Sequence, residues 1–120
     1  MSRKIAEKKS IQVKEYIKKY ISSLRGLSVE IREKLKEDFP TAKIVDFKTF
    51  LLPFSDELNL FIVVDNIDFE TEIKIGFALT GIERKYLKEK NTFCDILYAQ
   101  KTPKLDVAAI KRDYPFSLKV

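Results

Sequence analysis

The side chains that could do chemistry in this chain are carboxylates, lysines and tyrosines, because it has no histidine and a single cysteine. Without histidine, the usual general base is missing and no Ser-His-Asp or Cys-His arrangement can form. One thiol without histidine also excludes a structural zinc site. Cys94 lies in an apolar run with no base beside it, so we interpret it as a small buried hydrophobe. Any reaction would depend on carboxylates, lysine, tyrosine or a hard metal held by oxygen ligands.

The composition is typical of one small globular domain. The chain has 120 residues, of which 45% are hydrophobic and 34% charged, so we expect one folded core. No apolar run approaches the roughly 18 residues that a membrane span needs, and the charged start MSRKIAEKKS predicts no secretory signal. A lone cysteine cannot form an internal disulfide. We therefore expect a reducing, cytoplasmic location and no membrane association.

Two helices are predicted in the N-terminal third of the chain. The first covers residues 11–24, where apolar residues recur at helical spacing. These residues are Val13, Ile17, Tyr20 and Leu24. Gly26 is a stop signal, Ser28 is a candidate N-cap for the second helix, and Pro40 ends that helix. Because the stripe of the first helix must be covered, either the second helix packs on it or the protein forms a homodimer.

The remainder of the chain predicts a sheet. Residues 42–52 are rich in β-formers, and residues 58–64 form an almost unbroken apolar run. Such a run is typical of a central strand that is covered on both faces. Residues 92–99 predict a third strand, residues 104–112 a short helix, and the segment after Pro115 an edge strand. We expect an α+β fold in which the N-terminal helices pack on a mixed sheet.

Residues 69–89 give two conflicting signals. Their length, their Lys/Glu-rich end and the capping residue Asp68 favour a helix. The strict alternation of apolar residues from Ile73 to Leu79 favours a strand. We predict the helix, which would cross between the second and third strands of the sheet.

The segment IREKLKEDFPTAKIVDFKTFLLPFSDELNLFIVVDN resembles the opening of the minimal nucleotidyltransferases of the polymerase-β-like superfamily. That family has a helix, a strand, a Phe-Gly-Ser turn and a Ser-Asp-x-Asp-Leu motif before a Val-rich strand that ends in Asp. Here SDELNL, residues 55–60, precedes FIVVD, and Asp95 stands in the place of a third carboxylate. The ending AIKRDYPFSLKV is similar to the closing segment of the family. The resemblance covers residues 28–120 and leaves residues 1–27 as a separate basic helix.

The resemblance implies a site in which Glu57, Asn59 and Asp95 occupy the three carboxylate positions. In the family, two carboxylates spaced two residues apart point to one face of a strand and, with the third, hold magnesium ions against the nucleotide phosphates. The resemblance places Lys48 and Thr49 where the family has its Gly-Ser turn, as nucleotide-binding residues. A magnesium ion would be held by Glu57 and Asp95.

The chain departs from the family pattern at most of these positions. Asn59 removes one negative charge, and Glu57 is longer than aspartate by a methylene group, which moves its oxygens outward. Asp95 alone is intact. The resemblance therefore implies a degenerate, catalytically impaired domain that acts as a binding or partner protein, with itself or with a small helical protein as its partner.

A second motif keeps an alternative open. The triplet Glu72-Ile73-Lys74 resembles the E-x-K motif of restriction-endonuclease-like nucleases, which bind magnesium with an aspartate from a neighbouring strand. Asp56 or Asp65 could supply that aspartate. This alternative requires Glu72 and Lys74 to point the same way, as they would on a strand.

Positive charge is concentrated at the N-terminus. The net charge is +5, and residues 1–27 alone carry eight basic and two acidic residues. Lys4 and Lys8, and likewise Lys14 and Lys18, are one helical turn apart and could contact phosphates, so a non-enzymatic nucleic-acid-binding protein is a further alternative. The simpler interpretation is a solvated helix face. The abundance of Lys, Glu and Ile over Gln and Asn fits a thermophile or an AT-rich genome.

Overall fold

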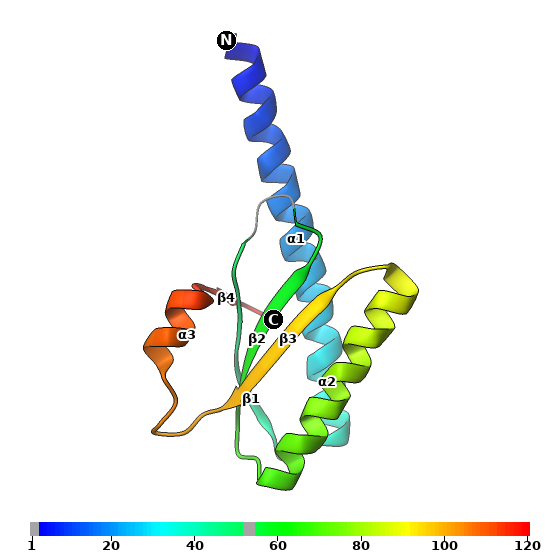
Figure 1. The fold of residues 1–120 in the computed structure, drawn as a ribbon, viewed down its shortest axis with the longest axis vertical. Coiled ribbons are helices and arrows are strands. Elements are labelled where there is room, and N and C mark those ends of the chain that lie inside the picture. Colours follow the sequence, from blue (N-terminus) through cyan, green and yellow to red (C-terminus); the bar gives the residue numbers. More distant parts are fainter. Residues whose placement is uncertain (1–2, 52–54) are drawn as a thin grey trace.

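The computed structural model describes residues 3–51 and 55–120, and their side chains from Gln12 onward. Three helices and four strands follow one another along the described chain (Figure 1). They are α1 (Arg3–Asp38), β1 (Lys43–Thr49), β2 (Leu58–Asp65), α2 (Phe69–Lys90), β3 (Cys94–Gln100), α3 (Val107–Asp113) and β4 (Phe116–Leu118). The predicted α+β class is confirmed, and each predicted strand is present, although residue 52 of the first lies outside the described residues.

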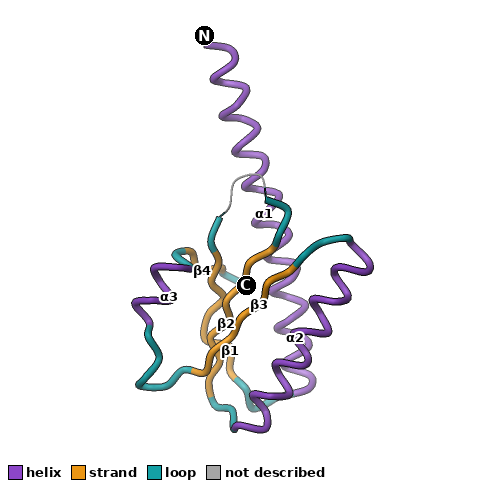
Figure 2. The backbone as a smooth tube through the Cα atoms, viewed as in Figure 1, coloured by secondary structure: helices purple, strands orange, loops and turns teal. Residues whose placement is uncertain are grey.

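The strands form one mixed sheet in the order β3-β2-β1-β4 (Figure 2). β1 is antiparallel to both β2 and β4, whereas β2 and β3 are parallel because α2 connects them as a crossover. β2 is therefore a central strand, as its apolar run predicts, and β3 and β4 are the two edges.

The N-terminal third is a single helix, so the prediction of two helices is wrong. α1 continues through Gly26, which is exposed and would leave an added Cβ with no atom within 4 Å. Ser28 does not cap a new helix, because its hydroxyl donates a hydrogen bond to the carbonyl of Leu24, 2.8 Å away and one turn earlier. One apolar face continues past both residues, and its members are completely or almost completely buried. These members are Tyr20, Leu24, Leu27, Ile31 and Leu35.

Residues 69–90 are helical, which confirms the predicted helix and its cap. The carboxylate of Asp68 accepts a hydrogen bond from the backbone N–H of Thr71 at 2.7 Å. Hydrogen bonding from the Thr71 side chain, followed by this bond from its backbone N–H, lowers the pKa of Asp68. At the other end, Asn91 adopts a left-handed conformation and ends the helix. The buried face of α2 consists of Ile75, Leu79, Ile82 and Tyr86.

The sheet has two unlike faces. One, which we call the α1/α2 face, packs against these two helices and supplies the core with alternate residues of β2. These residues are Leu58, Leu60, Ile62 and Val64. The intervening residues of β2 point to the opposite side, the α3 face, where the ring of Tyr114 after α3 lies 5.3 Å from that of Phe61 and 5.2 Å from that of Phe50. The core is thus made almost entirely on one side of the sheet.

The molecule is elongated, with principal extents of 59 × 35 × 18 Å. The beginning of α1 projects beyond the sheet as an arm, while the later part of the helix lies behind the strands (Figure 1). The boundary between residues 27 and 28, which the resemblance suggested as a division of the chain, falls inside this continuous helix.

Candidate functional site

Asn59 and Asp95 stand side by side in the sheet. They are register partners on the parallel strands β2 and β3, so both side chains belong to the α3 face. Glu57 lies just before β2, two residues from Asn59, and is exposed. The fold therefore brings together the three positions that the resemblance assigns to the family's carboxylates, at the end of the sheet where β2 and β3 begin.

Asn59 is the buried member of this trio, with 3% of its surface exposed. Its backbone is held on both sides: its N–H donates to the hydroxyl of Tyr20 at 3.3 Å, and its carbonyl accepts from the hydroxyl of Thr49 at 2.5 Å. Its side-chain amide donates a long hydrogen bond, 3.5 Å, to the carbonyl of Glu57. A neutral amide suits this position because burying a carboxylate without a partner is costly.

Asp95 is exposed and influences two neighbours. Burial raises the pKa of Glu83 on α2, and the negative charge of Asp95 raises it further. Burial is likewise the main cause that raises the pKa of the Tyr114 hydroxyl, with Asp95 again adding to it. Asp95 thus lies between the edge of α2 and the segment after α3, with a second carboxylate, Glu83, near enough to interact.

The residues present do not fit a magnesium site. Across residues 12–51 and 55–120, no three histidine, cysteine, aspartate or glutamate side chains are grouped so that they could hold a metal ion. Glu57 and Asp95 contribute two carboxylates, and Asn59 replaces the third with an amide. A hard divalent cation prefers several oxygen ligands with negative charge, which this set lacks.

Lys48 and Thr49, the residues in place of the Gly-Ser turn, are both buried. The ammonium group of Lys48 lies 3.2 Å from the carboxylate of Asp46 and 3.1 Å from the hydroxyl of Ser117, so its charge is neutralised within the sheet. The hydroxyl of Thr49 donates hydrogen bonds to the backbone carbonyls of Phe50 and Asn59. In this state neither side chain is directed to a phosphate, and their role in nucleotide binding stays a prediction.

The residues of the nuclease-type alternative are not arranged as that alternative requires. Glu72 and Lys74 lie on α2, where two residues apart means about 200° around the helix axis, so they cannot share a face. Lys74 instead forms an exposed ion pair with Glu70 at 3.3 Å. Asp56 lies before β2, far along the sheet from Asp65, which ends that strand.

The basic residues of the N-terminal segment lie on α1. Lys14 and Lys18 are exposed, whereas Lys4 and Lys8 belong to the part of the helix whose side chains are not described. The stripe on this helix is divided: Tyr20 and Leu24 are buried in the core, while Val13 is exposed on the arm. α1 therefore covers most of its own apolar face intramolecularly, which removes the main reason to expect a homodimer through this helix.

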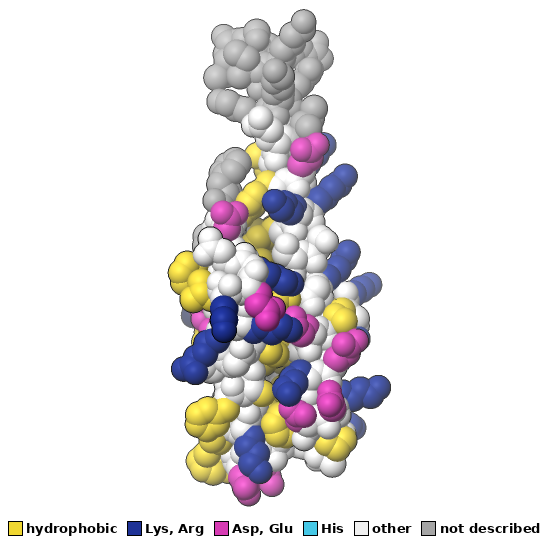
Figure 3. Space-filling model, turned by 90° about the vertical axis from the view of Figure 1, so that its right-hand side faces the viewer, with side chains coloured by type: hydrophobic (Ala, Val, Ile, Leu, Met, Phe, Trp, Pro, Cys, Tyr) yellow, Lys and Arg dark blue, Asp and Glu magenta, His cyan; other side chains and the backbone are white. Residues whose placement is uncertain are grey.

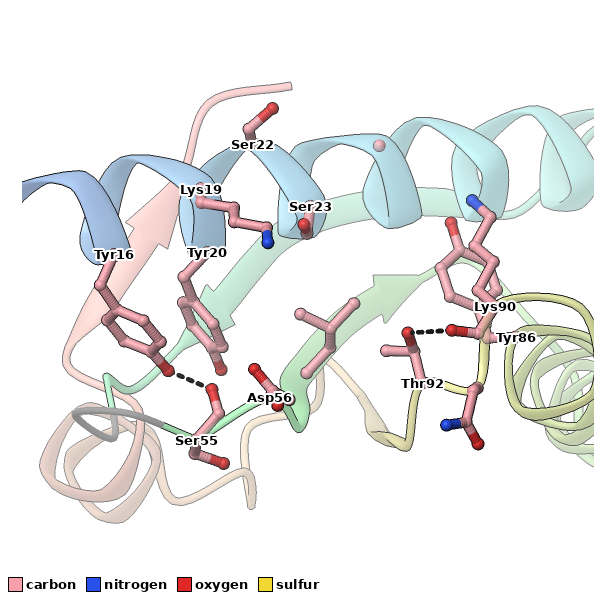
Figure 4. A pocket seen from close by; sticks show the side chains of 13 residues that line it. Tyr16, Lys19, Tyr20, Ser22, Ser23, Ser55, Asp56, Tyr86, Lys90 and Thr92 are labelled. Carbon is pink, nitrogen blue, oxygen red and sulfur yellow. Dashed lines mark hydrogen bonds between the residues drawn. The ribbon is translucent and has the colours of Figure 1, made fainter.

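A pocket lies at the same end of the sheet, on the α1/α2 side. Its volume is about 600 Å³, and it is bounded by α1, the residues just before β2, and the corner between α2 and β3. Figure 4 shows the rings of Tyr16 and Tyr20 extending from α1 towards Ser55 and Asp56. The Tyr16 hydroxyl donates to the carbonyl of Ser55, and the two tyrosine rings stack with centroids 6.1 Å apart.

Two lysines face this pocket from opposite walls. Lys19 comes from α1 and Lys90 from the last turn of α2, where its ammonium lies 4.4 Å from the centre of the Tyr86 ring (Figure 4). Among the described residues that line the pocket, Asp56 is the one carboxylate, so lysines outnumber acids there. The hydroxyls of Ser22, Ser23 and Thr92 add possible donors. The sequence indicates Lys19 only as one of the basic residues of the N-terminal segment and does not indicate Lys90, because only the packing of α1 against α2 brings the two together.

Cys94 is buried at the start of β3, as expected from its apolar surroundings. Burial raises the pKa of its thiol to about 11, so it carries almost no thiolate at neutral pH.

In the described part of the chain, none of the helices combines the length and the apolar character needed to cross a bilayer. Comparisons of the chain with protein-family models, with curated proteins and with solved structures give no match.

Proposed function

We propose that this chain is a nucleotidyltransferase-like domain that no longer transfers nucleotides efficiently and acts by binding a phosphate-bearing ligand. One observation carries the proposal. Asn59 and Asp95, which are distant in the sequence, are register partners on parallel strands, with Glu57 two residues before Asn59. The resemblance requires Asn59 and Asp95 to lie next to each other. The motif SDELNL does not by itself bring them together, because Asp95 lies outside it.

Impaired transfer follows from the chemistry of the three positions. Phosphoryl and nucleotidyl transfer depend almost entirely on positioning and on neutralising negative charge with metal ions. Asn59 contributes no charge, and its amide is turned to the carbonyl of Glu57 rather than to solvent. Asp95 and Glu57 remain as two separate, exposed carboxylates.

The pocket between α1 and α2 supports the binding part of the proposal. A volume of about 600 Å³ is in the range of cofactor-sized sites. Lys19 and Lys90 would neutralise phosphate charge from two sides, and tyrosine rings line the space beside them. The residues just before β2 border this pocket on the α1/α2 side, whereas the side chains of Asn59 and Asp95 belong to the α3 face, so the pocket and these two positions are separate at one end of the sheet.

Transfer is tested with labelled ATP and magnesium, using the protein itself and RNA as acceptors and autoradiography as the readout. We expect no labelled product. A product that disappears in the Asp95→Ala variant would contradict the impaired site and assign an enzymatic function to the domain.

Binding is tested separately by calorimetric titration with ATP, with and without magnesium. We expect Lys19→Gln and Lys90→Gln each to weaken binding about tenfold, because each removes a charge-assisted hydrogen bond worth about 1.5 kcal/mol. The matched control is Lys101→Gln, an exposed lysine at the opposite end of β3. Equal affinities for all variants, or no binding by the natural chain, would refute the pocket and leave the transfer result standing.

Exposed lysines on α1 favour nucleic acid as a second candidate ligand. Lys14 and Lys18 lie one turn apart, on or beside the part of the helix that projects from the body (Figure 1). Such contacts would be non-specific and would weaken steeply with salt. We expect little or no binding at about 150 mM salt in a fluorescence-polarisation titration. Tight binding that is lost on deletion of residues 1–19 would make nucleic acid the principal ligand.

A further inference from the structure

α2 is apolar on two sides, and only one of them is covered. Its buried face packs against α1 and the sheet. A second row of large apolar side chains, which we call the α2 stripe, faces solvent. It consists of Phe69, Ile73, Phe77 and Leu87. Phe69 and Phe77 are 77% and 74% exposed, which is unusual for two aromatic residues two turns apart on one helix.

The stripe adjoins the open edge of the sheet. β3 is an edge strand, and Tyr98 on it donates a hydrogen bond to the carbonyl of Glu72 on α2 at 3.1 Å. A groove of about 360 Å³ runs between the helix and this strand, lined by Ile73, Phe77 and Tyr98 among others. Leu97 adds exposed apolar surface on the α3 face of β3, and Phe93 adds more just before the strand. Figure 3, which views the side of the molecule that carries α2, shows hydrophobic side chains emerging among the charged ones.

We infer that this surface is the interface of a homodimer, in which two copies join β3 to β3 antiparallel and pack their α2 stripes against each other. The open edge of β3 offers unpaired backbone donors and acceptors that a second β3 can match. With Leu97 on the two-fold axis, Asp95 faces Ala99 of the partner subunit, so no two like charges meet. This inference does not depend on the proposed function.

The charges along α2 are complementary to a second copy. Two helices related by a two-fold axis across this surface run antiparallel. The stripe extends from Phe69 to Leu87, so its midpoint lies near Ala78. Glu70, at the acidic beginning of α2, then lies between Arg84 and Lys88 of the partner subunit, at its basic end. Both ends of the interface gain such a contact.

The size of the surface is also sufficient. A helix of 22 residues is about 33 Å long. A strip of that length, about 10 Å wide for the helix and about 5 Å for the adjoining strand, covers about 500 Å² per partner, or about 1,000 Å² in total, which is the lower bound for a specific interface. The charges also favour a second copy over a different protein as the partner. A different protein would not require Glu70 and Arg84 of this chain to be complementary to each other.

The test uses light scattering and sedimentation on the full chain over a wide concentration range. We expect twice the monomer mass of 14.0 kDa, and the monomer mass for Phe77→Glu. The control is Val107→Glu, an exposed apolar residue at the start of α3 on the opposite side of the molecule, which should remain dimeric. Circular dichroism verifies that each variant is folded.

Charge reversal distinguishes self-association from other causes. We expect Glu70→Arg and Arg84→Glu each to weaken dimerisation at least tenfold, because like charges then meet at both ends of the interface. The double variant Glu70→Arg/Arg84→Glu should dimerise as the natural chain does. A monomer at all concentrations overturns the inference, and so does a dimer that neither single reversal weakens or that the double variant fails to restore.

Discussion

The two faces of the sheet are built from the same strands but carry different kinds of side chain. On the α1/α2 face, β2 contributes Leu60 and its apolar neighbours to a continuous core. On the α3 face, the same strand presents Asn59 beside Asp95, and β1 presents the ion pair of Lys48 and Asp46. Because the side chains of a strand alternate, one strand can hold the fold together and carry polar groups at once. The comparison teaches that substitutions on the two faces of β2 should differ in their effect on stability.

The largest expected effect contrasts two adjacent residues of β2. Leu60→Ala should lower the free energy of unfolding by about 3 kcal/mol, because it removes a completely buried side chain and leaves a cavity. Asn59→Ala should cost about 1 kcal/mol or less, since its two backbone hydrogen bonds survive and only the 3.5 Å side-chain bond is lost. Urea denaturation measures both. Equal losses would mean that the two faces do not differ in this way.

Placing a charge on the α3 face gives the next largest effect. Asn59→Asp should destabilise the protein by about 2 kcal/mol at neutral pH, because it buries a carboxylate beside Asp95. The exposed control Asn66→Asp should cost less than about 1 kcal/mol. Thermal unfolding gives both values.

The same variant sharpens the functional contrast. With Asp at position 59, a set of three carboxylates would be complete, so millimolar magnesium should raise the Tm of Asn59→Asp and leave the natural chain unchanged. Adding Asp95→Asn should abolish the increase. A magnesium response in the natural chain would show that the amide at Asn59 does not prevent metal binding.

Two glycines of α2 test how tightly the α1/α2 side is packed. Gly81→Ala should stabilise the protein by about 1 kcal/mol, because an added Cβ meets no atom within 4 Å and alanine favours the helix. Gly76→Ala should lose that gain, since its Cβ would lie 2.6 Å from the hydroxyl of Tyr98 and displace the hydrogen bond to Glu72. In a Tyr98→Phe background, Gly76→Ala should become favourable. If Gly76→Ala and Gly81→Ala are equally stabilising in the natural background, the contact with Tyr98 is not a constraint.

The smallest effect concerns Glu83, at the boundary between the two faces. Its pKa is raised in the folded protein by burial and then by Asp95, so the folded state binds its proton more tightly than the unfolded state does. Stability therefore falls as pH rises above the ordinary value of about 4.5. Glu83→Gln should remove this loss and be more stable by about 0.5 kcal/mol at pH 7, with no advantage at pH 4. Tm values across that range provide the test, and a constant difference would exclude the linkage.

Local patterns predicted the elements well and their continuity poorly. Asp68 as a cap and the length of residues 69–89 indicated α2 correctly. The strand-like alternation in this segment has a physical cause: Ile73 and Phe77 form part of the exposed stripe, whereas Ile75 and Leu79 belong to the buried face. A helix that is apolar on two sides imitates the period of a strand.

Other features depended on tertiary packing and could not be predicted from local signals. Gly26 and Ser28 predict the end of one helix and the start of another, but the burial of Leu24 and Leu27 on one face holds α1 together. The proximity of Asn59 and Asp95 was an expectation of the resemblance alone. The pocket that joins Lys19 to Lys90 has no signal in the sequence, because it arises where two helices distant in the chain meet.

The crossover between β2 and β3 has a consequence for the order of folding. β1 and β2 are close in the sequence and pair antiparallel, whereas β2 and β3 pair in parallel only after the whole of α2 has been brought across the sheet. Closing that longer loop costs more chain entropy before any strand contact compensates for it. In the monomer, β3 should therefore dock after the β1–β2 hairpin and detach before it, and its amides should exchange with solvent through partial openings that leave the hairpin and α1 protected.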